Sequence, residues 1–217
     1  MTAEDRRRRI LDGIDQAAAL ARRDRQDVRL IAVSKGRNAE EIEALIAAGQ
    51  RDFGENRVQE AFAKWASLCT RYPDVRLHGI GRLQSNKARE AIELFDVIHS
   101  LDRLTLLHAL VKEAERVQRA PEVYIQVNIG EEEQKGGCGI GEIGELVAAV
   151  RSSPLSLAGL MAIPPMGVEP APYFELLAKL AQRHDVTGLS MGMSSDYKVA
   201  VMLGATAVRV GTALFED

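Results

Sequence analysis

The sequence predicts an α/β fold, a (β/α)8 TIM barrel built as a single domain over residues 1–217 with an extra N-terminal helix. Two observations lead to this prediction. Apolar, β-branched runs recur roughly every 25 residues and helical patterns separate most of them, which indicates parallel strands joined by crossover helices. Eight such runs are present, and eight units close into a barrel more naturally than they form an open sheet.

The eight strands are expected where short apolar runs end in polar or glycine-bearing turns. They cover residues 28–34, 51–55, 76–79, 97–100, 123–128, 156–161, 189–191 and 207–210. In barrels of this class the chemistry lies at the carboxyl ends of the strands. Side chains at those ends are therefore the first candidates for a functional site.

Apolar side chains spaced by about 3.6 residues predict the helices. The helix before the first strand carries the stripe Ile10, Ile14, Ala17, Ala18 and Ala21. Later stripes fall at Ile42, Leu45 and Ile46, at Leu104, Leu107, Val111, Ala114 and Val117, at Phe174, Leu177 and Leu180, and, for the last helix, at Val199, Ala200, Met202 and Leu203. Asn38 and Asp102 are expected to cap the helices that follow them.

The composition limits the partners and the compartment. A net charge of -3 argues against a nucleic-acid partner, and acidic residues flank the arginine run 6–9, as is typical of a solvated helix face. No run of 18 apolar residues is present, so no membrane span is expected, and the polar start shows no secretion signal. Cys69 and Cys138 lack metal-ligand spacing and fit a reducing cytoplasm.

Lys35 ends the first apolar strand run, and Gly36 follows it. A lysine at a strand end can form a Schiff base with an aldehyde. Most such lysines are simply solvated. Inside a barrel mouth, however, we expect Lys35 to be partly desolvated, which favours its neutral, nucleophilic form.

Two glycine-bearing turns follow the seventh and eighth strands. Gly192 and Gly211 let backbone N–H groups approach an anion, and Ser194 and Thr212 add hydroxyl donors. This fold often binds a phosphate at those two loops. The alternative is a pair of ordinary turns, with Ser194 or Ser195 capping the last helix. With Lys35, a phosphate site indicates an aldehyde that carries a phosphate, which points to pyridoxal 5'-phosphate (PLP).

Arg209 alternates with two valines, so it is expected to point into the barrel. A buried guanidinium needs a partner, either an acidic neighbour such as Glu55 or an aromatic ring nitrogen. His78 and His99 are acid–base candidates by residue type, although core histidines are the commoner case. Lys135, in a glycine-rich loop, either meets an anionic ligand or faces solvent.

Eight segments, in order along the chain, resemble one family. They are Ala32-Val33-Ser34-Lys35, Phe53-Gly54-Glu55-Asn56 with Val58-Gln59-Glu60, Leu77-His78-Gly79-Ile80-Gly81, Leu83-Gln84-Ser85-Asn86-Lys87, Val127-Asn128-Ile129, Gly159-Leu160-Met161-Ala162-Ile163-Pro164, Leu189-Ser190-Met191-Gly192-Met193-Ser194, and Val208-Arg209-Val210-Gly211-Thr212-Ala213-Leu214-Phe215. By these segments the chain closely resembles the PLP homeostasis proteins, also called the YggS-like or PROSC family.

The resemblance implies a barrel like the N-terminal domain of alanine racemase, with PLP bound as an aldimine on Lys35. It also implies that Arg209 faces the pyridine nitrogen and that Asn56 lines the ring pocket. Ser194, Gly211 and Thr212 would bind the phosphate. No catalytic residue and no metal ligand is implied, because the family looks like PLP carriers or regulators without robust turnover. Gly79 departs from the bulky aromatic residue often found there, which is expected to loosen that wall.

Two other functions stay open from the residues alone. One is a PLP-dependent amino-acid racemase or decarboxylase on the same barrel, which needs a second acid–base group opposite the lysine. The other is a Schiff-base aldolase that binds a phosphosugar without a cofactor. We expect the PLP homeostasis function, in a cytoplasmic monomer, with apo forms of PLP enzymes as possible recipients.

Overall fold

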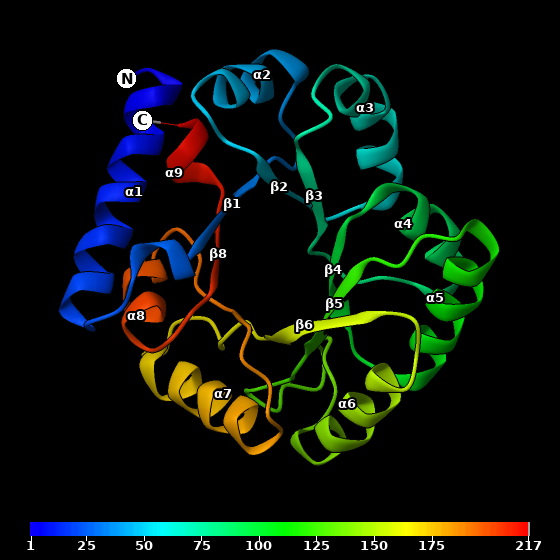
Figure 1. Ribbon diagram of the computed structural model, residues 1–217. Helices are drawn as coiled ribbons and strands as arrows, with labels where there is room; N and C mark the ends of the chain where they lie inside the picture. The colour runs from blue at the N-terminus through cyan, green and yellow to red at the C-terminus, as the bar shows by residue number, and fades with distance from the viewer. Residues whose placement is uncertain (217) are drawn as a thin grey trace.

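The computed structural model describes residues 1–216, and in it eight parallel strands close into a barrel surrounded by helices (Figure 1). The strands are β1 Arg29–Val33, β2 Asp52–Glu55, β3 Arg76–Gly79, β4 Val97–Leu101, β5 Glu122–Gln126, β6 Ser156–Met161, β7 Leu189–Ser190 and β8 Ala207–Val210. Each strand pairs with the next along the chain, and β8 closes the barrel on β1. The predicted (β/α)8 barrel is therefore confirmed. The single domain predicted for 1–217 ends at Asp217, which lies outside the described residues.

Helices follow the strands and cover the outside of the barrel. They are α1 Ala3–Leu20, α2 Ala39–Ala47, α3 Val58–Arg71, α4 Ala88–Leu94, α5 Leu104–Val117, α6 Ile143–Arg151, α7 Ala171–Arg183, α8 Tyr197–Met202 and α9 Thr212–Phe215, with short 3-10 turns η1 Arg25–Asp27, η2 Ser85–Lys87 and η3 Ile140–Glu142. The predicted extra helix is α1. It packs along α8 and α9, so the two ends of the chain lie together (Figure 1).

The strand boundaries match the sequence expectations within two residues, and two helix details differ. Asn38 caps α2 in a reciprocal capping box, as expected. Asp102 does not cap α5, because the N-cap is Arg103 and the Asp102 carboxylate pairs with the Arg103 guanidinium instead. The helix expected to be last, α8, is followed by α9, a single turn too short to show an apolar period.

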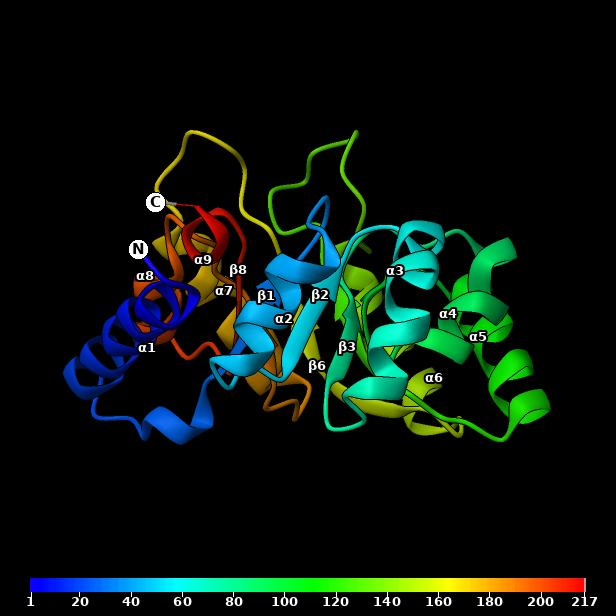
Figure 2. The ribbon, with the colours of Figure 1, turned by 90° about the horizontal axis from the view of Figure 1, so that it is seen from above.

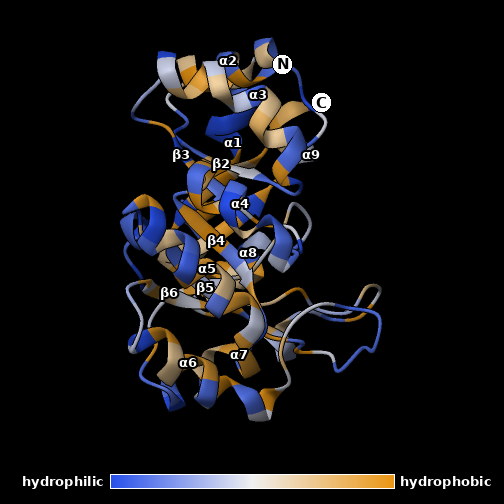
Figure 3. Cartoon of the chain, turned by 90° about the vertical axis from the view of Figure 1, so that its right-hand side faces the viewer, coloured by the Kyte–Doolittle hydropathy of each residue, from blue (hydrophilic) through white to orange (hydrophobic). Residues whose placement is uncertain are grey.

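The apolar core forms a shell between strands and helices. Hydrophobic residues, orange in Figure 3, recur along the strands and on parts of the surrounding helices. The inside of the barrel is different. It holds a small apolar cluster of Val97, Tyr124 and Met161, and the buried polar residues His78 and His99. No helix within residues 1–216 is long and apolar enough to cross a membrane.

Two loops project from one end of the barrel, after β5 and after β6 (Figure 2). They are tied together because Lys135 Nζ donates to the Pro164 carbonyl at 3.2 Å and pairs with Glu132 Oε2 at 2.5 Å. Asn128 closes the first loop by bonding to the backbone of Glu132 in both directions. Lys135 thus links two loops rather than simply facing solvent.

Candidate functional site

Lys35 lies immediately beyond the carboxyl end of β1, with its side chain exposed. The residue before it is anchored: Ser34 is fully buried and donates from Oγ to Glu55 Oε1 at 2.7 Å. Lys64 Nζ donates to both the Ser34 carbonyl and Glu55 Oε1, at 2.7 and 2.8 Å. The strand end is therefore held firmly while the Lys35 amine is free to meet a ligand. The expected partial desolvation of Lys35 by the protein itself is wrong.

The expected phosphate site is assembled beside this strand. Ser194 Oγ accepts from the Gly211 N–H at 3.3 Å, and Thr212, exposed, begins α9 directly after Gly211. Gly211 lies against β1, because a Cβ on it would sit 3.5 Å from Val33 Cβ. Ser194, Gly211 and Thr212 therefore meet at one corner, two residues from Lys35 along the strand.

Neither serine caps the last helices, so the capping role that the alternative gave them is wrong. The N-cap of α8 is Asp196, whose Oδ1 accepts from the Met193 N–H at 2.5 Å. The turn before it depends on Gly192, which has a φ of +92° and whose added Cβ would lie 2.6 Å from Ala200 Cβ. Only glycine fits a backbone that is both left-handed and this close to a helix.

Arg209 points into the barrel, as its alternation with the two valines predicted. It is 4% exposed, and it donates to Ser190 Oγ at 2.5 Å and to the Ala162 carbonyl at 3.0 Å. Burial lowers the pKa of Arg209 to about 10, so it stays charged at neutral pH. The suggested pairing with Glu55 is wrong: Glu55 faces outward to Trp65, and no carboxylate within residues 1–216 forms an ion pair with Arg209.

His78 and His99 lie beneath Arg209 in the barrel interior. His78 Nδ1 is 3.0 Å from His99 Nε2, and His99 Nδ1 is 2.9 Å from Ser190 Oγ. The Tyr124 ring stacks on His99 with its centroid 4.4 Å away. Burial lowers the pKa of His78, and it holds the pKa of His99 well below its ordinary value. Both rings are thus neutral interior groups.

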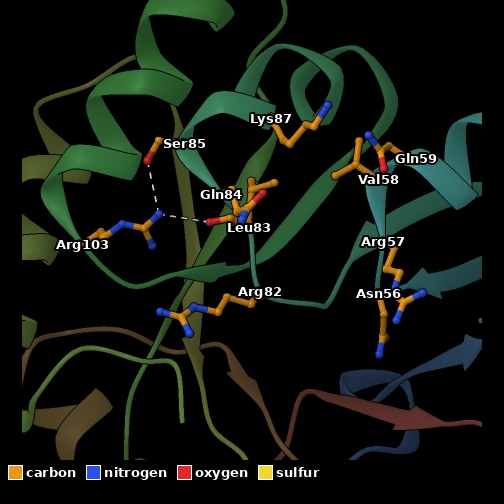
Figure 4. A pocket seen from close by; sticks show the side chains of 10 residues that line it. All are labelled: Asn56, Arg57, Val58, Gln59, Arg82, Leu83, Gln84, Ser85, Lys87 and Arg103. Atoms are coloured by element: carbon orange, nitrogen blue, oxygen red, sulfur yellow. Dashed lines mark hydrogen bonds between the residues drawn. The ribbon is translucent and has the colours of Figure 1, made fainter. Parts of the chain in front are cut away.

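A cavity of about 590 Å³ opens at the carboxyl end of β2 (Figure 4). Asn56 and Arg57 line one side of it and Arg82 and Arg103 the other, and Arg103 bonds to Ser85 Oγ at 3.2 Å. Asn56 is therefore at the barrel mouth, as the ring-pocket role requires. The basic residues of this cavity were not found from the sequence, because surface arginines give no periodic signal.

Asp52, Lys64 and Ser190 also had no assigned role from the sequence. Asp52 and Ser190 bond to the interior groups, and Lys64 secures the strand end before Lys35. For Asp52 and Ser190 the available signal was a polar residue at an inward-facing strand position, which is rare in a barrel core, whereas Lys64 lies on α3 and gave no such signal. Within residues 1–216, no group of three or more His, Cys, Asp or Glu is placed to hold a metal ion.

Comparison with known proteins identifies the family. The family described as the alanine racemase N-terminal domain matches residues 11–217. The pyridoxal phosphate homeostasis protein of Synechocystis sp. is 41% identical over 200 residues, covering 88% of this chain and 91% of that protein. Its Escherichia coli K12 counterpart is 39% identical over 216 residues, covering 95% and 92%.

The chain belongs to the pyridoxal phosphate homeostasis protein family.

Solved structures agree with this family assignment. PipY of Synechococcus elongatus, in a structure with PLP bound, has a TM-score of 0.80 and 42% identity, covering 94% of this chain and 99% of that one. The alanine racemase of Corynebacterium glutamicum, at 18% identity, has a TM-score of 0.64 and covers 94% of this chain and 60% of that one. The second likeness concerns the fold alone. The family of PLP homeostasis proteins therefore shares its barrel with a much longer enzyme.

Proposed function

We propose that this chain binds PLP at the barrel mouth and serves in intracellular PLP homeostasis without robust catalytic turnover. The main support is the close approach of Gly211 to Val33, which brings the residues proposed to bind the phosphate beside the end of β1, two residues before Lys35. A PLP-bound PipY structure at 42% identity and the names of the relatives support the same proposal.

The residues of the site fit the cofactor in charge and in hydrogen bonding. The phosphate needs several donors, which the Ser194 and Thr212 hydroxyls and the backbone after Gly211 offer. The ring nitrogen needs one donor, and the Arg209 guanidinium is buried without a carboxylate partner in the described chain. PLP itself supplies an aldehyde for a lysine amine and a ring that withdraws electrons.

The same residues favour a binding protein over a catalyst. Arg209 stays protonated at neutral pH and so donates to a ring nitrogen that carries no proton, which weakens electron withdrawal. Racemisation also needs a second acid–base group opposite the lysine. Tyr124 does not supply it, because this tyrosine lies inside the barrel and bonds to Thr206, at the amino end of the strands.

We place the protein in the cytoplasm as a monomer, with apo forms of PLP enzymes as recipients. The two cysteines, Cys69 and Cys138, are free thiols, as a reducing compartment would leave them. Sedimentation of the purified protein tests the monomer. Incubation of loaded protein with an apo-enzyme and a PLP trap tests the transfer.

The proposed function is tested by titrating PLP-free protein with PLP and recording the visible absorption spectrum. We expect saturable binding with a yellow band, and loss of that band in Lys35→Ala with the fold retained. Loaded protein is then incubated with L-amino acids in deuterated water, followed by chiral analysis. Absence of binding would refute the proposal, and exchange of the α-proton near the enzyme median of about 10 per second would support a racemase instead.

A further inference from the structure

Five polar side chains form one continuous hydrogen-bonded chain through the barrel, which we name the interior relay. It comprises Asp52, His78, His99, Ser190 and Arg209. Its four links measure 2.9 Å from Asp52 Oδ1 to His78 Nε2, 3.0 Å from His78 Nδ1 to His99 Nε2, 2.9 Å from His99 Nδ1 to Ser190 Oγ, and 2.5 Å from Ser190 Oγ to Arg209 Nη1. The relay starts at the first residue of β2 and crosses from β4 to β7.

The relay is buried except at one end. His78, His99, Ser190 and Arg209 are at most 4% exposed, whereas the Asp52 side chain is 21% exposed at the amino end of the barrel. Buried polar groups are costly unless each has a partner, and an apolar filling would serve packing equally well. A line of hydrogen-bonded groups that ends at Arg209 therefore indicates that the orientation of Arg209 matters to the protein.

The chemistry of the groups allows one direction for the donors. A guanidinium can only donate, so Ser190 Oγ accepts from Arg209; in the direction that needs no extra proton, Ser190 gives its own proton to His99 Nδ1. His99 then carries its proton on Nε2 and donates to His78 Nδ1. His78 in turn donates from Nε2 to the Asp52 carboxylate, so each of the four links joins one donor to one acceptor.

The opposite direction needs an extra proton inside the barrel. If His99 donated from Nδ1 to Ser190, His78 would have to donate at both nitrogens and become a cation. Burial and the cations Arg29 on β1, Arg76 on β3 and Arg209 on β8 oppose that charge, whereas the Asp52 carboxylate favours it. The lowered pKa values of both histidines show that the opposing effects dominate. The stacked Tyr124 is uncharged at neutral pH, because burial raises its pKa.

We propose that Asp52, His78, His99 and Ser190 are positioning residues that hold the Arg209 guanidinium in one orientation, ready to donate to the ring nitrogen of the cofactor. This rests on the proposed function, in which Arg209 faces the PLP ring nitrogen. Ser190 takes one Nη of Arg209 and the Ala162 carbonyl takes the other, which leaves the remaining donors for the ligand. The neutral histidines fix the Ser190 hydroxyl, so the serine cannot rotate away from the arginine.

The first test uses the PLP-free protein and needs no cofactor. Imidazole nitrogen NMR at pH 7 should show His78 and His99 neutral and protonated at Nε2 only. Asp52→Ala removes the final acceptor, so His99, which Asp52 does not touch, should then populate both tautomers. Glu122→Ala is the matched control, because Glu122 is a carboxylate at the same end of the barrel that pairs with Arg76. A proton on Nδ1 of either histidine in the parent protein, or no difference between the two variants, would overturn the relay.

The second test measures the effect of the interior relay on PLP binding. Ser190→Ala should lower PLP affinity about tenfold, since it removes one hydrogen bond to a charged group, and should shift the absorption band of bound PLP. Ser190→Thr, which keeps the hydroxyl, should restore both. Ser100→Ala is the control, because Ser100 is an equally buried strand serine whose Oγ has no hydrogen-bond partner.

Unchanged affinity and spectrum in Ser190→Ala would overturn the positioning role. If the parent protein bound no PLP at all, the proposed function would be refuted. The histidine tautomers measured in the PLP-free protein would still show whether the interior relay exists. The Arg209 Nη–H resonances give a further reading in the PLP-free protein. They should be sharp in the parent and exchange-broadened in Ser190→Ala, and equal sharpness in both would contradict a holding role.

Discussion

The Phe95 ring fills the space beside Gly79 at the end of β3. A Cβ built on Gly79 would lie 2.7 Å from Phe95 Cδ2, closer than side chains tolerate. The expectation that Gly79 loosens this wall is therefore wrong, because an aromatic ring from just before β4 occupies the place.

Gly79→Ala should therefore destabilise the protein. Forcing a methyl group against a ring that is 2% exposed requires shifts in a packed core, which typically cost about 1–3 kcal/mol. Urea unfolding measures the change. Gly141→Ala serves as the control, since a Cβ there meets nothing within 4 Å. Equal stability of the two variants would show that Phe95 moves aside freely.

Lys64→Met should lower the free energy of unfolding more than Gly79→Ala does, because it leaves the Glu55 carboxylate, 1% exposed, without its cation. Removing one partner of a buried pair typically costs about 3 kcal/mol or more. Adding Glu55→Gln to Lys64→Met should recover part of that loss. Lys179→Met breaks the exposed pair with Glu175 and should change the unfolding free energy little. A Lys64→Met protein as stable as the Lys179→Met protein would contradict the anchoring role.

The buried histidines predict a loss of stability in mild acid. Their pKa values are lowered in the folded chain, so below the ordinary value of about 6.5 the unfolded chain binds more protons, and the free energy of unfolding falls as the pH falls. Between pH 6.5 and 5.5 the fall should be about 1–2 kcal/mol, above the range in which carboxylates titrate. His99→Gln should reduce this slope, and His108→Gln, on the exposed face of α5, should not. A flat profile in the parent protein would mean that the folded and unfolded chains bind equal numbers of protons, which would contradict lowered pKa values of the interior histidines.

The corner formed by Ser194, Gly211 and Thr212, which we propose binds the phosphate, predicts a preference for PLP over pyridoxal. Ser194→Ala and Thr212→Val should each lower PLP affinity tenfold to a hundredfold, since a hydrogen bond to a phosphate contributes about 1.5–3 kcal/mol. Ser195→Ala is the neighbouring control, with an exposed serine. Equilibrium titration with both vitamers decides the matter. Equal affinity of the parent protein for pyridoxal and PLP would rule this corner out as a phosphate site.

The barrel and the outline of its site could be predicted from local patterns. The period of the apolar residues indicates strands and helices, and the carboxyl ends of β1, β7 and β8 then bring Lys35, Ser194 and Gly211 to one face. The inward direction of Arg209 followed from its two flanking valines.

Partners across the barrel could not be predicted in this way. Ser190 and His99 are 91 residues apart, and their meeting depends on how β4 and β7 face each other across the interior. Glu55 and Arg209 are both polar strand residues, but the pleat sends one outward to Trp65 and the other inward. The contact between the Phe95 ring and Gly79 likewise cannot be predicted from the spacing of apolar residues along the sequence.

Lys35 is the residue that we propose carries PLP. Protein loaded with PLP is reduced with borohydride, which fixes the bond between the cofactor and its lysine, and is then digested and mapped by mass spectrometry. We expect a single stoichiometric label on Lys35, the exposed amine beside the Ser194–Gly211 corner, and none in Lys35→Ala. A label on Lys87, Lys135 or Lys198 in place of Lys35 would contradict the account.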